Sequence, residues 1–158
     1  MKYKLSKEYN TIEPYYNELF PENERMDLHI LKQREGSALY LFFNENQLCG
    51  FIMLLTYLKI THILYLGVLK PYQNKGIGSK ILYTIQELYP TQIIIADLEK
   101  INKQRSNYLQ RIQRANFYLK NNFRPSKVQY TWQQDDYVIY EWNGCITQEE
   151  FRNFWKHY

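Results

Sequence analysis

The stretch Gln73-Asn74-Lys75-Gly76-Ile77-Gly78-Ser79 decides the fold of this 158-residue chain. It separates an extended apolar run, Ile60–Val68, from a segment whose apolar residues recur at helical spacing, Gly78–Tyr89. Two of the six glycines of the chain fall within it, at the point where a strand turns into a helix. Successive main-chain N–H groups in such a turn, together with the partial positive charge of a helix N-terminus, form a concave anion site. The stretch therefore predicts a phosphate-binding turn.

The two common nucleotide-binding motifs do not fit this turn. A Walker loop needs the order Gly-Lys-Ser/Thr, whereas this chain has Gly78-Ser79-Lys80, and the position five residues before Gly78 is Gln73. The dinucleotide fingerprint needs a third glycine where this chain has Ile81. On these residues alone, a strand-to-helix turn that binds no ligand remains the alternative.

Towards the N-terminus, the patterns predict three extended runs preceded by two helices. The first two runs form a hairpin because Asn44-Glu45-Asn46 is a turn sequence. The expected extended runs are Ala38–Phe43, Gln47–Tyr57 and Ile60–Val68. The first expected helix is Thr11–Phe20, which Thr11 caps and Pro21 ends, and the second is Met26–Arg34, which ends before Gly36.

Towards the C-terminus, the short apolar run Ile93–Leu98 is typical of a central strand buried on both faces. With the preceding strand and helix it makes a parallel βαβ unit, whose crossover should be right-handed. The next expected element is a helix over Tyr108–Asn121, with Ile112, Ala115 and Leu119 on one buried stripe and a left-handed Asn122 at its end. A hairpin follows, with strands Lys127–Trp132 and Tyr137–Trp142 and a turn at Gln133–Asp136. A last helix is opened by the capping box Thr147-Gln148-Glu149-Glu150. The fold class is therefore α+β: an antiparallel meander joined to one parallel βαβ unit, with a closing hairpin and a C-terminal helix, in a single domain over residues 1–158.

The composition is that of an ordinary globular protein, with 45% hydrophobic and 23% charged residues, which excludes a disordered or fibrous chain. No apolar run is long enough to span a bilayer, and the first residues lack the apolar stretch of a secretory signal. Two cysteines, Cys49 and Cys145, cannot build a disulfide scaffold, and their apolar neighbours predict small buried thiols. We expect a cytoplasmic protein.

The net charge of +4 is unevenly distributed. No acidic residue occurs between positions 101 and 127, where the basic residues are Lys103, Arg105, Arg111, Arg114, Lys120, Arg124 and Lys127. For any one of them, a solvated helix face is the expected role. Together they could also create a positive field that attracts nucleic acid or a phosphorylated cofactor.

The glycine turn resembles the Gln/Arg-x-x-Gly-x-Gly/Ala loop of the GNAT family of N-acetyltransferases, which binds the pyrophosphate of acetyl-coenzyme A. The context is similar too, because Leu66-Gly67-Val68 ends the preceding strand five residues before Gln73. Downstream, Phe117–Phe123 resembles the Tyr-x-x-x-Gly-Phe helix end of the family, with Asn122 in the glycine place. The segment Asn107–Arg114 looks like the version found in small bacterial members.

The resemblance implies a GNAT-like mixed sheet and transfer of an acetyl group from acetyl-CoA to a primary amine, without a metal. It also implies that the main chain at the end of the strand pairs with the pantetheine arm, and that the turn takes the pyrophosphate. The implied cofactor-binding residues are Leu66, Gly67, Val68, Gln73, Asn74, Lys75, Gly76, Ile77, Gly78 and Ser79.

In this family the amine attacks the acetyl carbonyl directly. The resemblance implies a backbone N–H near the end of the strand as the oxyanion donor and Tyr118 as the acid that protonates the departing thiolate, with nearby basic residues lowering the pKa of Tyr118. A base must deprotonate the ammonium substrate, but the strand Ile60–Val68 contains no Glu or Asp. We expect Glu99 to act as this base through water, with Asp97 and His62 as alternatives.

The acceptor is expected to be a small-molecule or peptide amine, bound by a monomer or homodimer. Glu22, Glu24 and Asp27 could attract a cationic amine, and Tyr65 and Tyr57 could wall its pocket. Two other functions remain open. One is an acyl-CoA-binding sensor or pseudoenzyme of the same fold. The other is a nucleic-acid or ribosome-associated binder that uses the basic segment 101–127.

Overall fold

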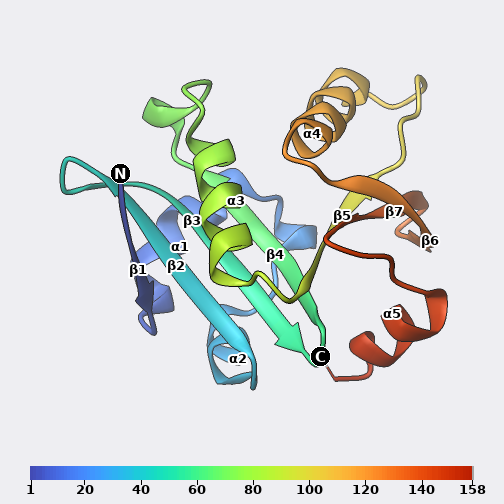
Figure 1. Ribbon diagram of the computed structural model, residues 1–158. Coiled ribbons are helices and arrows are strands. Elements are labelled where there is room, and N and C mark those ends of the chain that lie inside the picture. The colour runs from blue at the N-terminus through green and yellow to red at the C-terminus, as the bar shows by residue number, and fades with distance from the viewer. Residues whose placement is uncertain (158) are drawn as a thin grey trace. The chain divides into compact units, whose positions relative to one another are not determined.

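The computed structural model describes residues 1–157. The contacts of the chain group into two compact units (Figure 1). One unit comprises residues 1–56 and 63–88, and the other comprises residues 57–62 and the described residues from 89 onwards. The single domain expected over residues 1–158 stays a prediction. Each unit is described by itself below.

The first unit is built on the strand order β1-β2-β3-β4. Its strands are β1 (Lys2–Ser6), β2 (Ser37–Asn44), β3 (Gln47–Tyr57) and the part of β4 (Ile60–Val68) from residue 63 on. β1 pairs with β2, and β2 with β3, in antiparallel register, with a bulge between Phe42 and Phe43. The two extended runs expected over 47–57 and 60–68 are thus confirmed.

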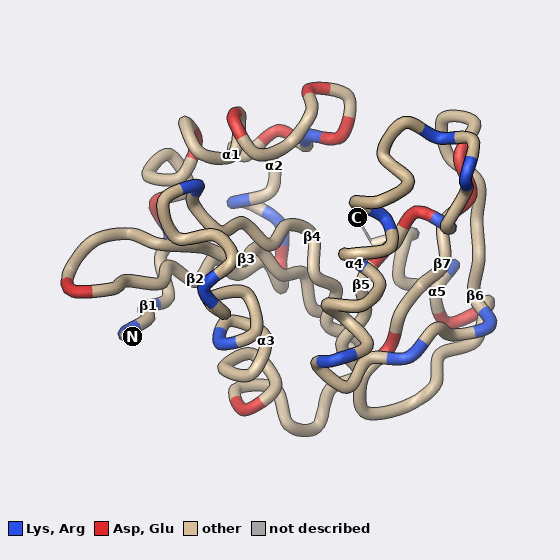
Figure 2. Tube along the Cα trace, turned by 90° about the horizontal axis from the view of Figure 1, so that it is seen from above, with Lys and Arg blue, Asp and Glu red and all other residues tan. Residues whose placement is uncertain are grey.

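Helices cover both faces of this part of the sheet. Figures 1 and 2 show α1 and α2 on one face and α3 on the other. The helical elements are η1 (Tyr9–Ile12), α1 (Glu13–Leu19), η2 (Glu22–Glu24), α2 (Leu28–Gln33), η3 (Lys70–Tyr72) and α3 (Ile77–Leu88). α1 and η1 bury Tyr16 and Ile12 against Phe51 of β3, whereas α3 buries an apolar stripe that includes Ile81 and Ile85. This stripe has the helical spacing that the sequence predicted.

The second unit carries the strand order β5-β7-β6, paired antiparallel throughout. Its elements are β5 (Ile93–Glu99), α4 (Tyr108–Lys120), β6 (Arg124–Trp132), β7 (Asp135–Trp142) and α5 (Gln148–Trp155). The first residues of β4 belong to this unit and run parallel to β5, where the Ile93 N–H donates to the Lys59 carbonyl at 2.8 Å. The closing hairpin and the C-terminal helix are confirmed.

Several local predictions were wrong. β1 was not predicted, although its side chains alternate between lysine and apolar types, because the run has only five residues and four of them are exposed. Thr11 does not cap the first helix, since it lies within η1 and α1 begins after Ile12 without a side-chain cap. Cys49 is buried as expected, but Cys145 is exposed.

The buried stripe of α4 also differs from the prediction. Leu119 is exposed and Ile112 is half-buried, whereas the buried face consists of Arg111, Ala115 and Tyr118. The expected left-handed closing residue is confirmed, since Asn122 has a φ of 72°. The helix end is therefore where the sequence predicts it, and its inward face is rotated. No helix within residues 1–157 is both long and apolar enough to cross a membrane.

The capping box of α5 gives a stability prediction. The Thr147 hydroxyl accepts from the Glu150 N–H at 3.1 Å, and the Glu150 carboxylate accepts from the Thr147 N–H at 3.0 Å. Thr147→Ala should lower the free energy of unfolding by about 1 kcal/mol, and the melting temperature by about 2–4 °C. Thr11→Ala is the matched control, because Thr11 caps nothing, and should cost under about 0.5 kcal/mol. Equal losses in a thermal melt would contradict the capping assignment.

Candidate functional site

The glycine turn begins where β4 ends. The Leu69 N–H donates to the Cys49 carbonyl of β3 at 2.9 Å and fixes the end of the strand. The Gln73 side-chain amide then reaches back and donates to the Val68 carbonyl at 2.9 Å. Gln73 therefore braces the turn from within, and it occupies the carbonyl of a residue expected to pair with the pantetheine arm.

The turn presents unpaired main-chain donors. Asn74 and Gly76 have φ angles of 62° and 78°, both in the left-handed region. Within residues 1–157, the amides of Asn74, Lys75 and Gly76 donate no hydrogen bond, and α3 begins at Ile77. A Cβ built on Gly76 would meet no atom within 4 Å. The turn thus offers a row of free N–H groups beside open space at a helix N-terminus, which fits a diphosphate.

Gly67 has a different reason to be glycine. A Cβ at this position would lie 2.6 Å from the Phe51 ring and 3.1 Å from Leu19. Side chains alternate along a strand, so Tyr65 and Gly67 face α1, whereas Leu66 and Val68 face the other way and are half-buried. The small residue lets the ring of Phe51 pack directly against the main chain of β4.

Tyr118 is buried on α4 and packs edge-on against the rings of Phe117 and Phe123, each with a centroid distance of 5.2 Å. Its hydroxyl makes no hydrogen bond within residues 1–157. Burial raises the pKa of Tyr118 to about 12; Arg114 opposes this shift and Asp97 adds to it. The basic neighbour Arg114 does lower this pKa, as expected, but desolvation outweighs its effect, so the net shift of the pKa is upward. The hydroxyl is therefore neutral at physiological pH.

Glu99 lies at the end of β5, in an ion cluster around the buried Arg111. One oxygen of its carboxylate accepts from Arg111 at 2.8 Å, and the other accepts from the Asn107 amide at 3.3 Å. The Arg111 guanidinium is only 3% exposed and also binds Asp135 at 3.0 Å and the Lys100 carbonyl at 2.8 Å. Glu99 thus has a structural partner for each oxygen, whatever its part in catalysis.

The two alternative bases contact each other. His62 on β4 is buried, and its Nε2 is hydrogen-bonded to the Asp97 carboxylate on β5. Tyr130 donates to the second oxygen of Asp97. His62 also packs edge-on against the rings of Phe154 and Trp155 of α5. His62 is therefore a core histidine held by a carboxylate and aromatic rings.

The acidic residues expected near the acceptor lie between α1 and α2, where Figure 2 shows a concentration of acidic positions. Glu22 and Glu24 are part of η2. Asp27 caps α2, because its side chain accepts from the N–H groups of His29 and Ile30. Tyr65 contacts this segment through its hydroxyl. Tyr57 belongs to the other unit, where its ring stacks on His157 at 3.7 Å.

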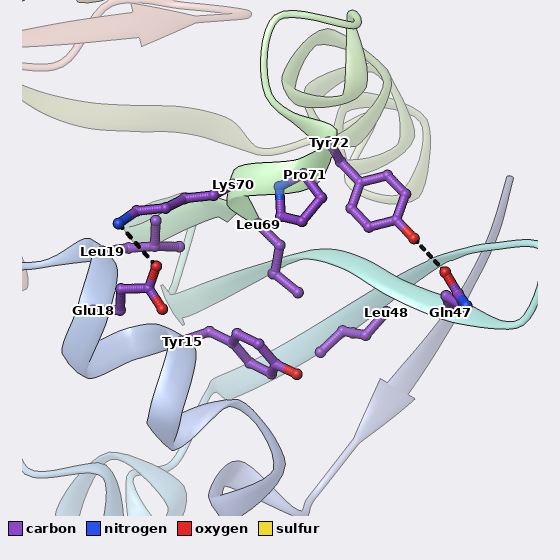
Figure 3. A pocket seen from close by; sticks show the side chains of 9 residues that line it. All are labelled: Tyr15, Glu18, Leu19, Gln47, Leu48, Leu69, Lys70, Pro71 and Tyr72. Carbon is purple, nitrogen blue, oxygen red and sulfur yellow. Dashed lines mark hydrogen bonds and ion pairs between the residues drawn. The ribbon is translucent and has the colours of Figure 1, made fainter.

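A cavity of about 470 Å³ opens in the first unit beside the segment that leads into the turn (Figure 3). Its apolar floor comes from Leu19 of α1, Leu48 of β3 and Leu69, which directly follows β4. Two polar pairs hold its edges: Glu18 with Lys70 at 3.0 Å, and Tyr72 with Gln47 at 2.7 Å. The lining residues are Tyr15, Glu18, Leu19, Gln47, Leu48, Leu69, Lys70, Pro71 and Tyr72. None of the site residues expected from the sequence lines it.

The sequence did not predict two residues that hydrogen-bond the candidate bases, Arg111 and Tyr130. Arg111 was read as part of a solvated basic face, and Tyr130 was one aromatic among many on an expected strand. Charge alternation gives no signal for either, since their carboxylate partners Glu99 and Asp97 precede them by 12 and 33 residues. Among residues 1–157, no group of three or more His, Cys, Asp or Glu side chains could hold a metal ion.

Comparison with known proteins places the chain in a family. The family model of the acetyltransferase (GNAT) domain matches residues 35–125, which include the glycine turn and Tyr118. The chain therefore belongs to the GNAT family, a class of acetyltransferase enzymes, as the turn predicted. No curated protein sequence matches it significantly.

Solved structures of this family share the fold. A protein described as a GNAT acetyltransferase from Bacteroides thetaiotaomicron is 16% identical, with a TM-score of 0.78 over 98% of this chain and 93% of its own. An acetyltransferase from Bacillus subtilis in complex with CoA is 18% identical, with a TM-score of 0.65 over 89% and 97%. The aminoglycoside 6′-N-acetyltransferase from Enterococcus faecium is 11% identical, with a TM-score of 0.64 over 90% and 96%. These likenesses confirm the expected α+β fold class.

The ion cluster gives a prediction for Glu99. Glu99→Gln leaves the buried Arg111 with Asp135 as its one carboxylate partner within the described residues. The substitution should therefore lower the free energy of unfolding, measured by urea titration, by about 2 kcal/mol. Glu45→Gln, at an exposed hairpin turn, is the control and should cost under about 0.5 kcal/mol. The pH–rate profile of Glu99→Gln separates the two roles. If the acid limb is unchanged while stability is lost, Glu99 is not the base.

Proposed function

We propose that this protein transfers the acetyl group of acetyl-CoA directly to a primary amine. The observation that supports this most is the glycine turn, where free amides of Asn74, Lys75 and Gly76 surround open space at the N-terminus of α3. Membership of the acetyltransferase family supports acetyl-CoA as the ligand, and the Bacillus subtilis acetyltransferase of similar fold is in complex with CoA.

Different parts of the turn would have different roles in holding the diphosphate. The amides of residues 74–79 would donate to phosphate oxygens, while Lys75 and Lys80 add positive charge from exposed positions. Gln73 would act indirectly, because its side chain already holds the Val68 carbonyl. The main chain of Leu66–Val68 would pair with the pantetheine arm, chiefly through donors and carbonyls other than that of Val68.

Tyr118 would donate a hydrogen bond to the departing sulfur. Its pKa of about 12 lies well above that of a thiol, about 8.5, so complete proton transfer to a free thiolate is uphill by about 5 kcal/mol. The hydroxyl would therefore stabilise the developing negative charge without giving up its proton. The proton that reaches the sulfur would come from the attacking amine, which becomes acidic as the N–C bond forms.

We propose Glu99 as the general base, acting through a water molecule. For this role its carboxylate must accept a proton while Arg111 holds the other oxygen. Asn107 is the more distant of the two partners, at 3.3 Å, and is the one a water molecule would replace. Asp97, bonded to His62 and Tyr130, is the second carboxylate on β5 and the comparison for the same test.

The nucleic-acid alternative is weakened by the contacts of the basic segment. Arg111 is buried and ion-paired, Arg105 pairs with Asp135 at 3.2 Å, and Arg124 donates to the Phe123 carbonyl at 2.8 Å. Three of the seven cations of this segment thus already have protein partners, two of them carboxylates. A sensor or pseudoenzyme would bind acetyl-CoA without turnover. Release of CoA thiol with a panel of spermidine, kanamycin, lysine and an alanyl peptide distinguishes it from an enzyme.

Replacing Gly78 tests the binding of acetyl-CoA. Gly78→Val places a branched side chain at the first turn of α3, where the diphosphate would lie. By isothermal titration the Kd should rise at least about 30-fold, the loss of about 2 kcal/mol expected for charge-assisted hydrogen bonds. Valine is a better helix former than glycine, so the fold should be retained. Tyr83→Val, at an exposed position of the same helix, is the matched control and should leave the Kd unchanged. A wild-type protein that binds no acetyl-CoA would refute the proposal.

Removing the Tyr118 hydroxyl tests the chemical step. Tyr118→Phe should lower kcat about 10- to 100-fold with little change in the Kd of acetyl-CoA. A group with a pKa of about 12 loses its proton only at higher pH, so Tyr118 stays neutral through pH 10 and the factor should be the same at pH 7 and pH 9. An alkaline fall of the wild-type rate below pH 10 that disappears in Tyr118→Phe would contradict this.

A further inference from the structure

We infer that Tyr65 is a positioning residue for the amine acceptor: through its hydroxyl it fixes the main chain of the acidic segment, residues 22–27, against β4. This inference rests on the proposed function and deepens it. All the residues involved belong to the first unit.

The Tyr65 hydroxyl makes two hydrogen bonds to the acidic segment. It donates to the Glu24 carbonyl at 2.6 Å and accepts from the Met26 N–H at 2.9 Å. A second tyrosine completes the attachment, since the Tyr16 hydroxyl of α1 donates to the Met26 carbonyl at 2.8 Å. One residue of the segment, Met26, is thus held at both its N–H and its C=O by tyrosine side chains.

The segment is short and irregular, although the Glu24 N–H donates to the Pro21 carbonyl at 2.9 Å and the Asp27 side chain caps α2. η2 is a single turn of three residues without a side-chain cap, and Arg25 has extended dihedral angles. Arg25 bonds Asn17 through one guanidinium nitrogen, at 2.6 Å, while its buried Nε has no partner within the described residues. The two tyrosines, by contrast, are rigid: their rings meet edge-on at 4.8 Å, and Phe20 packs on Tyr65 at 5.0 Å. The hydroxyls therefore hold a short, irregular segment from a fixed aromatic base.

Tyr65 also connects this segment to the strand proposed to hold the cofactor. It directly precedes Leu66-Gly67-Val68 in β4, and its burial raises its pKa, so the hydroxyl keeps the proton that it donates to Glu24. The same short stretch of β4 would thus pair with the pantetheine arm through its main chain and set the position of the carboxylates of Glu22 and Glu24 through one side chain. A change in the hydroxyl should alter acceptor binding and leave cofactor binding alone.

Tyr65→Phe tests the inference because it keeps the ring and removes both bonds. The acceptor KM, measured with the amine of the panel that turns over fastest, should rise about tenfold, with kcat and the Kd of acetyl-CoA within twofold. Without any substrate, hydrogen exchange of the Met26 amide should become about tenfold faster. Tyr16→Phe, which removes the bond to the Met26 carbonyl, should change the acceptor KM in the same direction and by less.

Tyr9→Phe is the matched control. Tyr9 is as buried as Tyr65 and lies in the same core, but its hydroxyl bonds Ser37 at 2.6 Å and does not touch the acidic segment. It should leave both the acceptor KM and the Met26 exchange rate unchanged. If Tyr65→Phe leaves the acceptor KM within twofold, or if Tyr9→Phe raises it equally, the inference is overturned while the proposed function stands. A wild-type protein that binds no acetyl-CoA overturns both.

Discussion

The turn between β4 and α3 depends on one constraint: the chain must pass from a strand into a helix while its amides point away from the protein. The bond from Leu69 to Cys49 ends the strand, and Gln73 ties the turn back to Val68. The left-handed residues Asn74 and Gly76 then leave three successive N–H groups without a protein acceptor among the described residues. Donors so placed must be satisfied by water or by a ligand. An anion would satisfy several of them at once, and this is the physical reason for proposing the turn as the diphosphate site.

The sequence predicted the elements whose stability comes from their own apolar pattern. β3 and β4 begin and end as expected because each is a long, nearly continuous apolar run, and α3 because its stripe repeats at helical spacing. β1 has no such pattern. Its side chains are exposed, and it is a strand because β2 offers an edge to pair with, from Lys2 opposite Phe43 to Ser6 opposite Leu39. Pairing with a distant strand is a tertiary effect, which local hydropathy does not record.

The candidate site also depends on contacts between distant residues, which the local sequence does not reveal. The glycine turn could be predicted because its chemistry lies in consecutive residues. The orientation of α4 could not, because hydropathy assigns arginine to the surface, whereas Arg111 is buried by its bonds to Glu99 and Asp135. Arg111 shares the buried face of α4 with Ala115 and Tyr118, and desolvation on this face raises the pKa of Tyr118 to about 12. The pairing of Arg111 with Asp135 spans 24 residues, so the local sequence does not reveal which face of the helix is buried.

The chain contains 16 tyrosines, and the contacts of several of them give a physical reason for this residue type. A buried tyrosine contributes an aromatic ring to the core and still carries a hydroxyl that can bond a polar group at its edge. Tyr65 and Tyr16 bond the main chain of the segment after α1, Tyr72 bonds the side chain of Gln47 at the start of β3, and Tyr130 bonds the carboxylate of Asp97. Phenylalanine would fill the same space but lose these hydrogen bonds. At these positions the choice of tyrosine therefore reflects a second requirement beside packing, since the ring must also carry a group that bonds a main-chain or side-chain atom nearby.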